Sequence, residues 1–483
     1  MSVLKDLEPK LLWRHFEALS KIPRASGNET AAAAYCVSFA QRLGLKHHVD
    51  ATGNVVIYKP ASRGREKSET IVLQSHLDMV CEKNTDKAFD FNHDAIELIK
   101  EDDWLTANGT TLGADNGIGV AAILAIFEDE SLVHGPLEGV FTVDEERGLN
   151  GAKTLSPDHI HGRTLINLDS EDLGIFSIGC AGGRDTNMIL SVERVKPRHD
   201  LFLKIHLSGL RGGHSGIDIH KGRGNAVKIL NRLLYQLYAQ TPFELAGMDG
   251  GDKHNAIPRE AFAHLTIPAV ELNKVKKWLS EKIAEMRREF SPVEPDIKLA
   301  VEESRTLPPL VMTVKSAKTL FSLLFALPHG TLAMSRTMPN MVETSNNVAA
   351  IHSEEQSIHI LCSSRSSNMQ ALAATTDKLL AIAELAGAEA VQPNGYPGWM
   401  PNVDSRVLKV ALDTYQQTTG QPAKYEAIHA GLECGLIGEK FPGMDMISIG
   451  PTLQHPHSPD ERVHIGSVNV FYLHVLKMLA SYA

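Results

Sequence analysis

Histidines and carboxylates, the side chains that bind divalent metal ions, gather in a few short segments of this chain. Asp115 lies between glycines in the stretch TTLGADNGIG, directly before an apolar helix that we predict over residues 118–127. An aspartate in such a stretch commonly marks a tight turn. Four other segments of similar composition suggest a second interpretation. They contain His76 with Asp78, Glu145 with Glu146, Asp169, and His457.

Two histidines and three carboxylates, with a spare Asp and a spare Glu, suit two divalent ions held by nitrogen and oxygen ligands. Two ions about 3.5–4 Å apart need a bridging carboxylate, and a water bound there loses a proton near pH 7. In the pair Glu145–Glu146, one carboxylate can bind metal while the other takes a proton from water. The chemistry that we predict is therefore hydrolysis. No G-x-S-x-G, H-E-x-x-H or P-loop motif points to another site.

Several of these residues directly follow short apolar runs. The runs TIVLQ (70–74), LEGVFTV (137–143) and TLINL (164–168) have the length and β-branched content of strands buried on both faces. Helical patterns alternate with them, which predicts an α/β fold with a mainly parallel sheet sandwiched by helices. Sites in such sheets lie at the carboxyl ends of the strands, and the acidic residues fall there.

The middle of the chain has a different pattern. Residues 201–207 alternate between apolar and polar side chains, which predicts a half-buried antiparallel strand in an α+β domain. The later run MDMISIG (444–450) is similar to the buried strands of the first block. We therefore predict a catalytic domain in two segments, residues 1–184 and 400–483, with an inserted lid domain over residues 185–399.

Length and composition limit the classes of protein to consider. A chain of 483 residues is too long for one ordinary core, and its net charge of −10 without a Lys/Arg block excludes a nucleic-acid partner. No apolar run approaches the ~18 residues of a membrane span, and charges run through the N-terminal segment, so we expect a cytoplasmic protein without membrane contact. Five scattered cysteines without a C-x-x-C pair indicate neither a disulfide framework nor a zinc ribbon.

Together these motifs resemble the co-catalytic zinc dipeptidase and aminoacylase superfamily. Within it, the resemblance runs along nearly the whole chain to the branch of dipeptidases that cleave Xaa-His substrates. The superfamily motifs are HLDMV (76–80), GADNG (113–117), DEE (144–146), NLD (167–169) and GGHSG (212–216), and those of the branch are NAIPRE (255–260), YPGW (396–399), HAGLECG (429–435) and HSPDE (457–461).

The resemblance implies two Zn²⁺ ions per chain, with Co²⁺ or Mn²⁺ as possible substitutes. Asp115 would bridge the ions. His76 and Asp169 would complete the shell of one ion, and Glu146 and His457 that of the other. The implied activity is hydrolysis of unblocked dipeptides, including Xaa-His dipeptides such as β-alanyl-histidine, by a metal-activated water.

The remaining roles implied by the resemblance concern the base and the substrate. Glu145 would be the general base, and Asp78 would hold the ring of His76 in its tautomer. The inserted domain would be a lid that also carries the contact of a homodimer. Four residues would bind the substrate, namely His214, Asn255 and Arg365 of the inserted domain and Gly431 of the catalytic domain.

Two alternatives stay open at this point. An aminoacylase, or a peptidase that acts on longer chains, would use the same ligands for a different substrate. A catalytically silent binding protein on the same fold would show the loss of a ligand or of the base, and neither is missing from this sequence.

Overall fold

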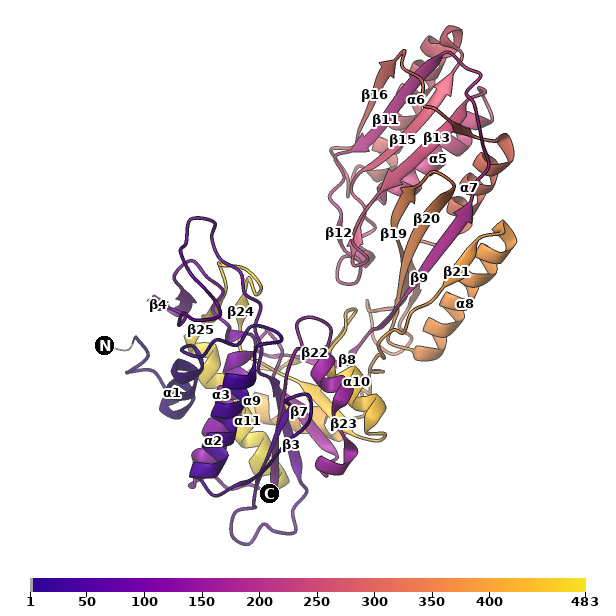
Figure 1. Cartoon of the computed structure of the whole chain (residues 1–483). Coiled ribbons are helices and arrows are strands. Elements are labelled where there is room, and N and C mark those ends of the chain that lie inside the picture. The colour runs from indigo at the N-terminus through magenta and orange to yellow at the C-terminus, as the bar shows by residue number, and fades with distance from the viewer. Residues whose placement is uncertain (1–2) are drawn as a thin grey trace. The chain divides into compact units, whose positions relative to one another are not determined.

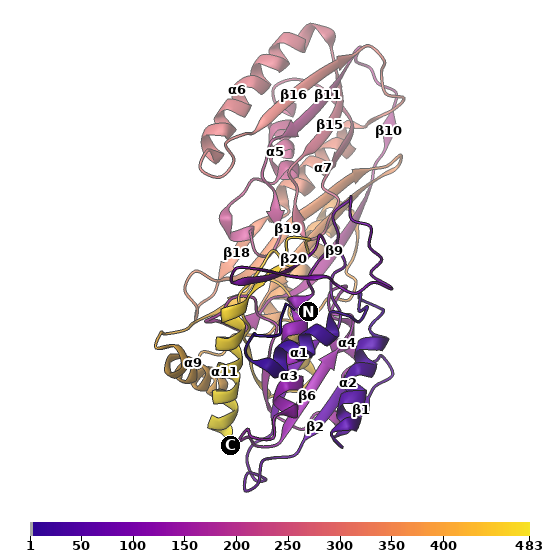
Figure 2. The same cartoon turned by 90° about the vertical axis from the view of Figure 1, so that its left-hand side faces the viewer.

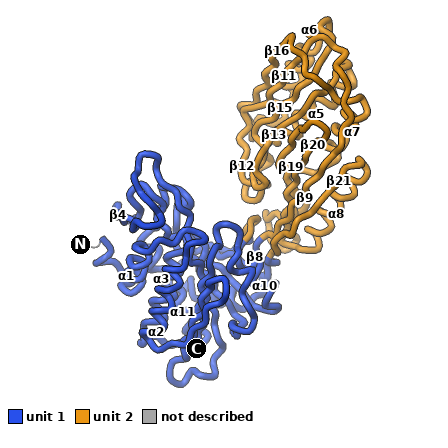
Figure 3. Tube along the Cα trace, in the orientation of Figure 1, with its two compact units in different colours: residues 1–180, 399–427, 432–483 blue, residues 181–398, 428–431 orange. Residues whose placement is uncertain are grey.

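The computed structural model describes residues 3–483, which form two compact units (Figure 3). The boundaries that we predicted lay at 184/185 and 399/400, whereas the chain passes between the units at 180/181 and 398/399. A later four-residue segment also belongs to unit 2, which the sequence did not indicate. Of the described residues, unit 1 comprises 3–180, Trp399–Ala427 and Leu432–Ala483, and unit 2 comprises Ala181–Gly398 and Ile428–Gly431.

Unit 1 is built on an eight-stranded sheet (Figure 1). Four adjacent strands in its middle run parallel, and antiparallel pairs flank them. In spatial order the strands are β1 (Lys46–Val49), β2 (Val55–Lys59), β6 (Leu137–Thr142), β3 (Ile71–His76), β7 (Thr164–Asn167), β23 (Asp445–Ser448), β8 (Ile175–Cys180) and β22 (Lys424–Ile428).

Helices cover both faces of this sheet, as expected for central strands that are buried throughout. One layer packs against the apolar side chains of β2, β3, β6, β7 and β23 through a cluster that includes Leu149 and Phe441. The predicted α/β sandwich is confirmed. The helices of unit 1 are α1 (Lys10–Leu19), α2 (Thr30–Arg42), α3 (Ala114–Glu128), α4 (Asn150–Thr154), α9 (Arg406–Thr419), α10 (Glu433–Lys440) and α11 (Ile465–Tyr482).

The helix α3 is the central element of one layer, where it packs on α1 and β3 (Figures 1 and 2). It is apolar on all sides and buried along almost its whole length, as such a helix must be. Asp115 and Asn116 at its start have non-helical backbone angles, so the regular helix begins after them. At Gly119 an added Cβ would lie 2.7 Å from Ser75 Oγ and 2.8 Å from the Leu168 carbonyl oxygen. Glycine therefore lets the start of α3 approach the ends of β3 and β7.

A second, four-stranded sheet of unit 1 anchors the C-terminal hairpin. The hairpin strand β25 pairs with β5, a strand that precedes α3 in the chain. The loop between the two hairpin strands holds His457. In spatial order the strands are β24 (Leu453–Gln454), β25 (Arg462–His464), β5 (Trp104–Ala107) and β4 (Leu98–Glu101).

Unit 2 contains a nine-stranded sheet with helices on one face and a solvent-exposed opposite face. Its strands are β16 (Lys298–Ser304), β11 (Leu201–Ser208), β15 (Ala261–Ile267), β13 (Glu244–Gly250), β19 (Val342–Ser353), β20 (Ser357–Ser366), β9 (Gly182–Ser191) and β21 (Glu389–Val391), with β18 (Gly330–Met334) beside β19. The helices are α5 (Ala226–Tyr238), α6 (Leu272–Phe290), α7 (Val314–Ala326) and α8 (Met369–Ala386). Two short pairs complete the unit, β10 (Arg194–Val195) with β17 (Val311–Met312) and β12 (Gly213–His214) with β14 (Ala256–Ile257).

The strand β11 shows why one face of this sheet is exposed. Leu203, Ile205 and Leu207 are fully buried under the helices, while Lys204 on the opposite face is exposed. Both neighbours of β11 are antiparallel to it, so the predicted half-buried antiparallel strand is confirmed. Over the described residues of both units, no helix has the length and apolar character that crossing a membrane requires.

Candidate metal centre

Three of the predicted ligands meet where parallel strands of unit 1 end. His76 is the last residue of β3, Asp169 follows β7, and Asp115 precedes the regular part of α3. The ring nitrogen Nε2 of His76 lies 3.1 Å from Asp115 Oδ1 and 3.2 Å from Asp169 Oδ1. These three side chains form the first group, whose ligand atoms lie close enough to one another to hold one metal ion.

A second group uses the other oxygen of the same aspartate. His457 Nε2 lies 3.2 Å from Asp115 Oδ2 and 3.1 Å from Glu146 Oε2. Glu146 lies in the loop after β6, and His457 comes from the C-terminal hairpin. The structure therefore brings all five predicted ligands together, and Asp115 contributes one oxygen to each group.

The hydrogen bonding of the two groups fits metal ions. A ring nitrogen carries one proton or one lone pair, so His76 Nε2 cannot satisfy Asp115 and Asp169 at once. Two buried oxygens, Asp169 Oδ1 and Glu146 Oε1, have no hydrogen-bond partner. Ligand atoms about 2.0–2.2 Å from one tetrahedral ion are roughly 3.3–3.6 Å apart, close to the separations found here. Imidazole nitrogens and carboxylate oxygens are donors that divalent transition metals accept.

The pKa values of three side chains in this cluster are raised. Hydrogen bonds to Asp115 and Glu146 raise the pKa of His457 to about 11. Burial lowers the pKa of His76, but the nearby carboxylates, Asp169 above all, outweigh burial and raise it well above its usual range. Burial raises the pKa of Asp169 to about 6. Because metal ligands must be deprotonated, bound cations would take the place of protons on these side chains.

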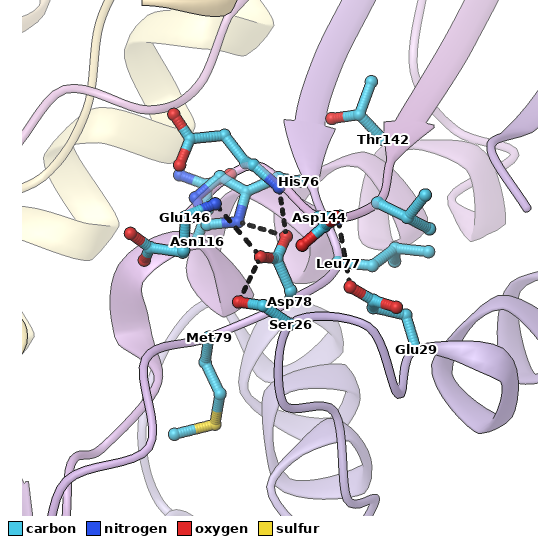
Figure 4. Close-up of polar contacts among 12 residues, drawn as sticks. Ser26, Glu29, His76, Leu77, Asp78, Met79, Asn116, Thr142, Asp144 and Glu146 are labelled. Carbon is cyan, nitrogen blue, oxygen red and sulfur yellow. Dashed lines mark hydrogen bonds and ion pairs between the residues drawn. The ribbon is translucent and has the colours of Figure 1, made fainter. Parts of the chain in front are cut away.

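Asp78 links the first histidine to the loop after β6 (Figure 4). Its carboxylate is fully buried, and Oδ1 lies 3.3 Å from Nδ1 of His76. The same carboxylate accepts hydrogen bonds from Ser26 Oγ at 2.7 Å and from the backbone N–H groups of Glu145 and Glu146 at 3.1 Å each. The Asp78 carboxylate therefore lies against the His76 ring and binds the backbone that carries the predicted base and its neighbouring ligand, and its role in orienting the ring stays a prediction.

Glu145 reaches the cluster beside His76 and Glu146. Burial raises its pKa well above the usual range, and the charges of Asp169 and Glu433 raise it further. A carboxylate with a raised pKa is a stronger base once it has lost its proton, as general-base catalysis requires. The position of Glu145 is thus compatible with the role that the resemblance implies for it.

Three of the predicted substrate residues lie in unit 2 as expected, and Gly431, predicted in the catalytic domain, belongs to unit 2 as well. The function of all four toward the metal cluster stays a prediction. Arg365 is almost fully buried on β20, and its Nη1 donates a hydrogen bond to the Tyr396 hydroxyl at 2.7 Å. Asn255 is exposed, next to β14. At Gly431 an added Cβ would lie 2.9 Å from the Tyr396 ring, so a larger residue does not fit there without movement.

The ring of His214 has a defined tautomer. Its Nδ1 accepts hydrogen bonds from the backbone N–H groups of Gly216 at 3.2 Å and Ile217 at 3.1 Å. Burial and the charge of Arg365 lower its pKa, which favours the neutral ring. The single proton of that ring therefore sits on Nε2, where it is available to an acceptor.

Three buried charged residues around the cluster were not predicted from the sequence. Glu433 accepts hydrogen bonds from Gln74 at 2.6 Å and Thr142 at 2.8 Å, and burial raises its pKa to about 7. Glu461 and Arg24 contact the backbone around Asp115 and are described below. The motifs HAGLECG and HSPDE contain both glutamates, but no local spacing shows what they contact.

Comparison with known proteins agrees with this geometry. Residues 205–294 match the peptidase dimerisation domain of M20 peptidases. The cytosol non-specific dipeptidase of Escherichia coli (strain K12) is 40% identical over 481 residues, which cover 99% of both chains. The chain therefore belongs to the cytosol non-specific dipeptidase family.

Solved structures agree with this assignment. The crystal structure of aminoacylhistidine dipeptidase from Vibrio alginolyticus has a TM-score of 0.94 at 40% identity and covers 99% of this chain and 98% of that one. An aminopeptidase from Bacillus cereus, 16% identical with a TM-score of 0.59 over 99% of both chains, shares the fold. The family resemblance inferred from the motifs is confirmed.

The geometry of Asp115 leads to a direct prediction. Asp115→Asn replaces one carboxylate oxygen by an NH₂ group, which cannot bind a cation, so one of the two groups loses a ligand. We expect metal affinity to fall by at least about 10-fold, measured by equilibrium dialysis with elemental analysis. Asp172→Asn, an exposed acid outside both groups, is the matched control and should bind metal like the wild type. Unchanged metal content and affinity in Asp115→Asn would contradict the shared position of this carboxylate.

Proposed function

We propose that this chain is a dinuclear metallo-dipeptidase that hydrolyses unblocked dipeptides, including Xaa-His dipeptides such as β-alanyl-histidine. The observation that carries the proposal is the carboxylate of Asp115, whose two oxygens face two different histidines. Full-length similarity to a cytosol non-specific dipeptidase and to an aminoacylhistidine dipeptidase supports the substrate class.

We propose two zinc ions as the metals, held by the first group and by the second group. The mixed nitrogen and oxygen ligands support zinc and would also accept Co²⁺ or Mn²⁺. When bound, such ions polarise the peptide carbonyl and make water acidic enough to lose a proton near pH 7.

Within this reaction we assign proton transfer to Glu145. The carboxylate takes a proton from the attacking water and delivers it to the leaving amine nitrogen. Its burial beside Asp169 and Glu433 supports this assignment, because both raise its pKa toward the working range of a general base. The hydrogen bond that the Glu145 backbone N–H donates to the Asp78 carboxylate keeps the base next to the ligands.

Glu145→Gln should retain the metal ions and lose at least about 10² in kcat, because the amide cannot accept the proton. Steady-state kinetics on a dipeptide, combined with elemental analysis of the same preparation, measures both effects. Asp144→Asn is the matched control from the same loop, because the Asp144 carboxylate accepts hydrogen bonds from Arg147 and Asn150 and belongs to neither metal group. Wild-type kcat in Glu145→Gln would remove Glu145 from the reaction.

We propose that unit 2 supplies the substrate contacts. The Nε2–H of His214 would donate a hydrogen bond to the oxyanion that forms on the scissile carbonyl. Arg365, with its Nη1 already fixed by the Tyr396 hydroxyl, would bind the free C-terminal carboxylate. Asn255 and Gly431 would contact the peptide backbone.

Arg365→Ala should lower kcat/KM for a dipeptide by roughly 10- to 100-fold, mainly through KM, because a hydrogen bond to a charged group is lost. The sharper readout is the ratio of kcat/KM for a dipeptide and for the same dipeptide with an amidated C-terminus. The wild type should prefer the free acid strongly, and Arg365→Ala should lose most of that preference. An unchanged ratio would contradict the carboxylate contact.

A substrate panel tests the activity itself. The zinc-loaded protein should hydrolyse β-alanyl-histidine and other unblocked dipeptides much faster than a tripeptide or an N-acetyl amino acid. An aminoacylase would prefer the N-acetyl amino acid, and a peptidase for longer chains would prefer the tripeptide. Either order, or no turnover of any compound, would contradict the proposal.

We further propose a cytoplasmic homodimer joined through unit 2. The match of residues 205–294 to a peptidase dimerisation domain supports the assembly, and the cytosolic relative supports the location. Light scattering that gave the mass of a single chain would contradict the dimer. Cell fractionation that found the protein outside the cytosol would contradict the location.

A further inference from the structure

The backbone N–H groups on the N-terminal side of Asp115 are bound by a single side chain from the C-terminal hairpin. Glu461 is almost fully buried and accepts four backbone hydrogen bonds. Its Oε2 accepts from the N–H groups of Leu112 at 2.7 Å and Gly113 at 2.9 Å. Its Oε1 accepts from Ala114 at 2.8 Å and Asp115 at 3.2 Å. One carboxylate thus satisfies every N–H group from residue 112 to residue 115.

The same segment is bound by a buried guanidinium group. Arg24 is 2% exposed, and its Nη1 donates hydrogen bonds to the carbonyl oxygens of Leu77 and Asp78 at 2.9 Å each. Its Nη2 donates to the carbonyl oxygen of Gly113. Arg24 therefore joins the segment after His76 to the turn before Asp115.

The glycines on either side of Asp115 leave room for this arginine. A Cβ added at Gly113 would lie 2.5 Å from Arg24 Nη2, and one added at Gly117 would lie 2.7 Å from it. Gly113 also has a φ of +70°, in the region that favours glycine. The glycine pattern that distinguishes this stretch in the sequence therefore makes space for a buried cation next to the turn.

We propose that Glu461 and Arg24 are positioning residues that hold Asp115 where one carboxylate serves both metal ions. Glu461 lies four residues after His457, so its bonds also fix the loop that carries this histidine. Arg24 fixes the chain segment that carries His76 and Asp78. Through the backbone next to Asp115, the two side chains thus connect the segment that carries His76 with the loop that carries His457. This inference rests on the proposed dinuclear function.

The test compares zinc binding by Glu461→Gln with that of the wild type. Glutamine has the shape of glutamate, but either orientation of its amide turns an NH₂ group toward two backbone N–H donors. At least two of the four hydrogen bonds are then lost. We expect zinc affinity to fall about 10- to 100-fold, measured in competition with a chelator. The visible spectrum of the Co²⁺-substituted protein should change as well.

The matched control is Asp460→Asn, which removes the same charge one residue away from an exposed side chain. It should bind zinc like the wild type. Glu461→Asp keeps the charge and should recover part of the affinity, and it replaces Glu461→Gln if that variant does not fold. The melting temperatures of the metal-free variants and wild type show how much Glu461 stabilises the fold. A loss of zinc affinity without a matching loss of stability then indicates positioning of the metal ligands.

Wild-type zinc affinity and an unchanged Co²⁺ spectrum in the Glu461 variant would overturn the inference, even if the metal-free protein melted at a lower temperature. Equal zinc loss in Asp460→Asn would overturn it too, since a general charge effect would then explain both. Tight zinc binding by a wild type that cleaves no dipeptide would contradict the proposed function and leave this inference standing.

Discussion

The candidate metal centre of unit 1 depends on the position of one carboxylate. Asp115 places its two oxygens 3.1 and 3.2 Å from ring nitrogens of two histidines, one 39 and the other 342 residues away in the chain. The parallel strands β3 and β7 bring His76 and Asp169 to the same edge of the sheet. The C-terminal hairpin brings His457 to the other oxygen. Each of these elements is needed because a single turn cannot supply all ligands of two ions.

Electrostatics explains why so many polar contacts surround this carboxylate. Carboxylates that share a buried space repel one another. Burial and this repulsion raise the pKa values of Asp169 and Glu145, and the same carboxylates raise those of His76 and His457. Divalent cations held by the two groups would offset the repulsion more effectively, and they would also remove the conflict in which His76 Nε2 faces two carboxylates. Backbone N–H groups donate hydrogen bonds to the carboxylates of Asp78 and Glu461. The Arg24 guanidinium donates to the backbone carbonyl oxygen of Asp78. The ligand set of this site thus fits divalent metal ions.

Much of this site followed from short-range patterns. The apolar runs before His76, Glu145 and Asp169 predicted three buried strands, and the structure has strands there within a few residues. Their adjacency in the sheet is a result of the structure. The ligand assignment itself came from the family motifs. The half-polar edge strands β1 and β4 were not predicted, because their side chains are partly exposed and lack a clear alternation.

Contacts between residues far apart in the chain could not be predicted from the sequence. The hydrogen bond that the Asp115 N–H donates to Glu461 spans 346 residues, and the one that Gln74 donates to Glu433 spans 359. No spacing rule connects residues so far apart, and acids in polar motifs usually point to solvent. The transfer of Ile428–Gly431 to unit 2 depends in the same way on pairing with a distant segment, since Ala181 N–H donates to the carbonyls of Ile428 and Ala430.

The most direct test of this account is the anomalous diffraction of crystals grown with zinc, measured at the zinc absorption edge. We expect two peaks per chain, one next to each oxygen of Asp115, with His76 at one peak and His457 at the other. A single peak, or two peaks of which only one touches Asp115, would contradict the shared carboxylate on which the account depends.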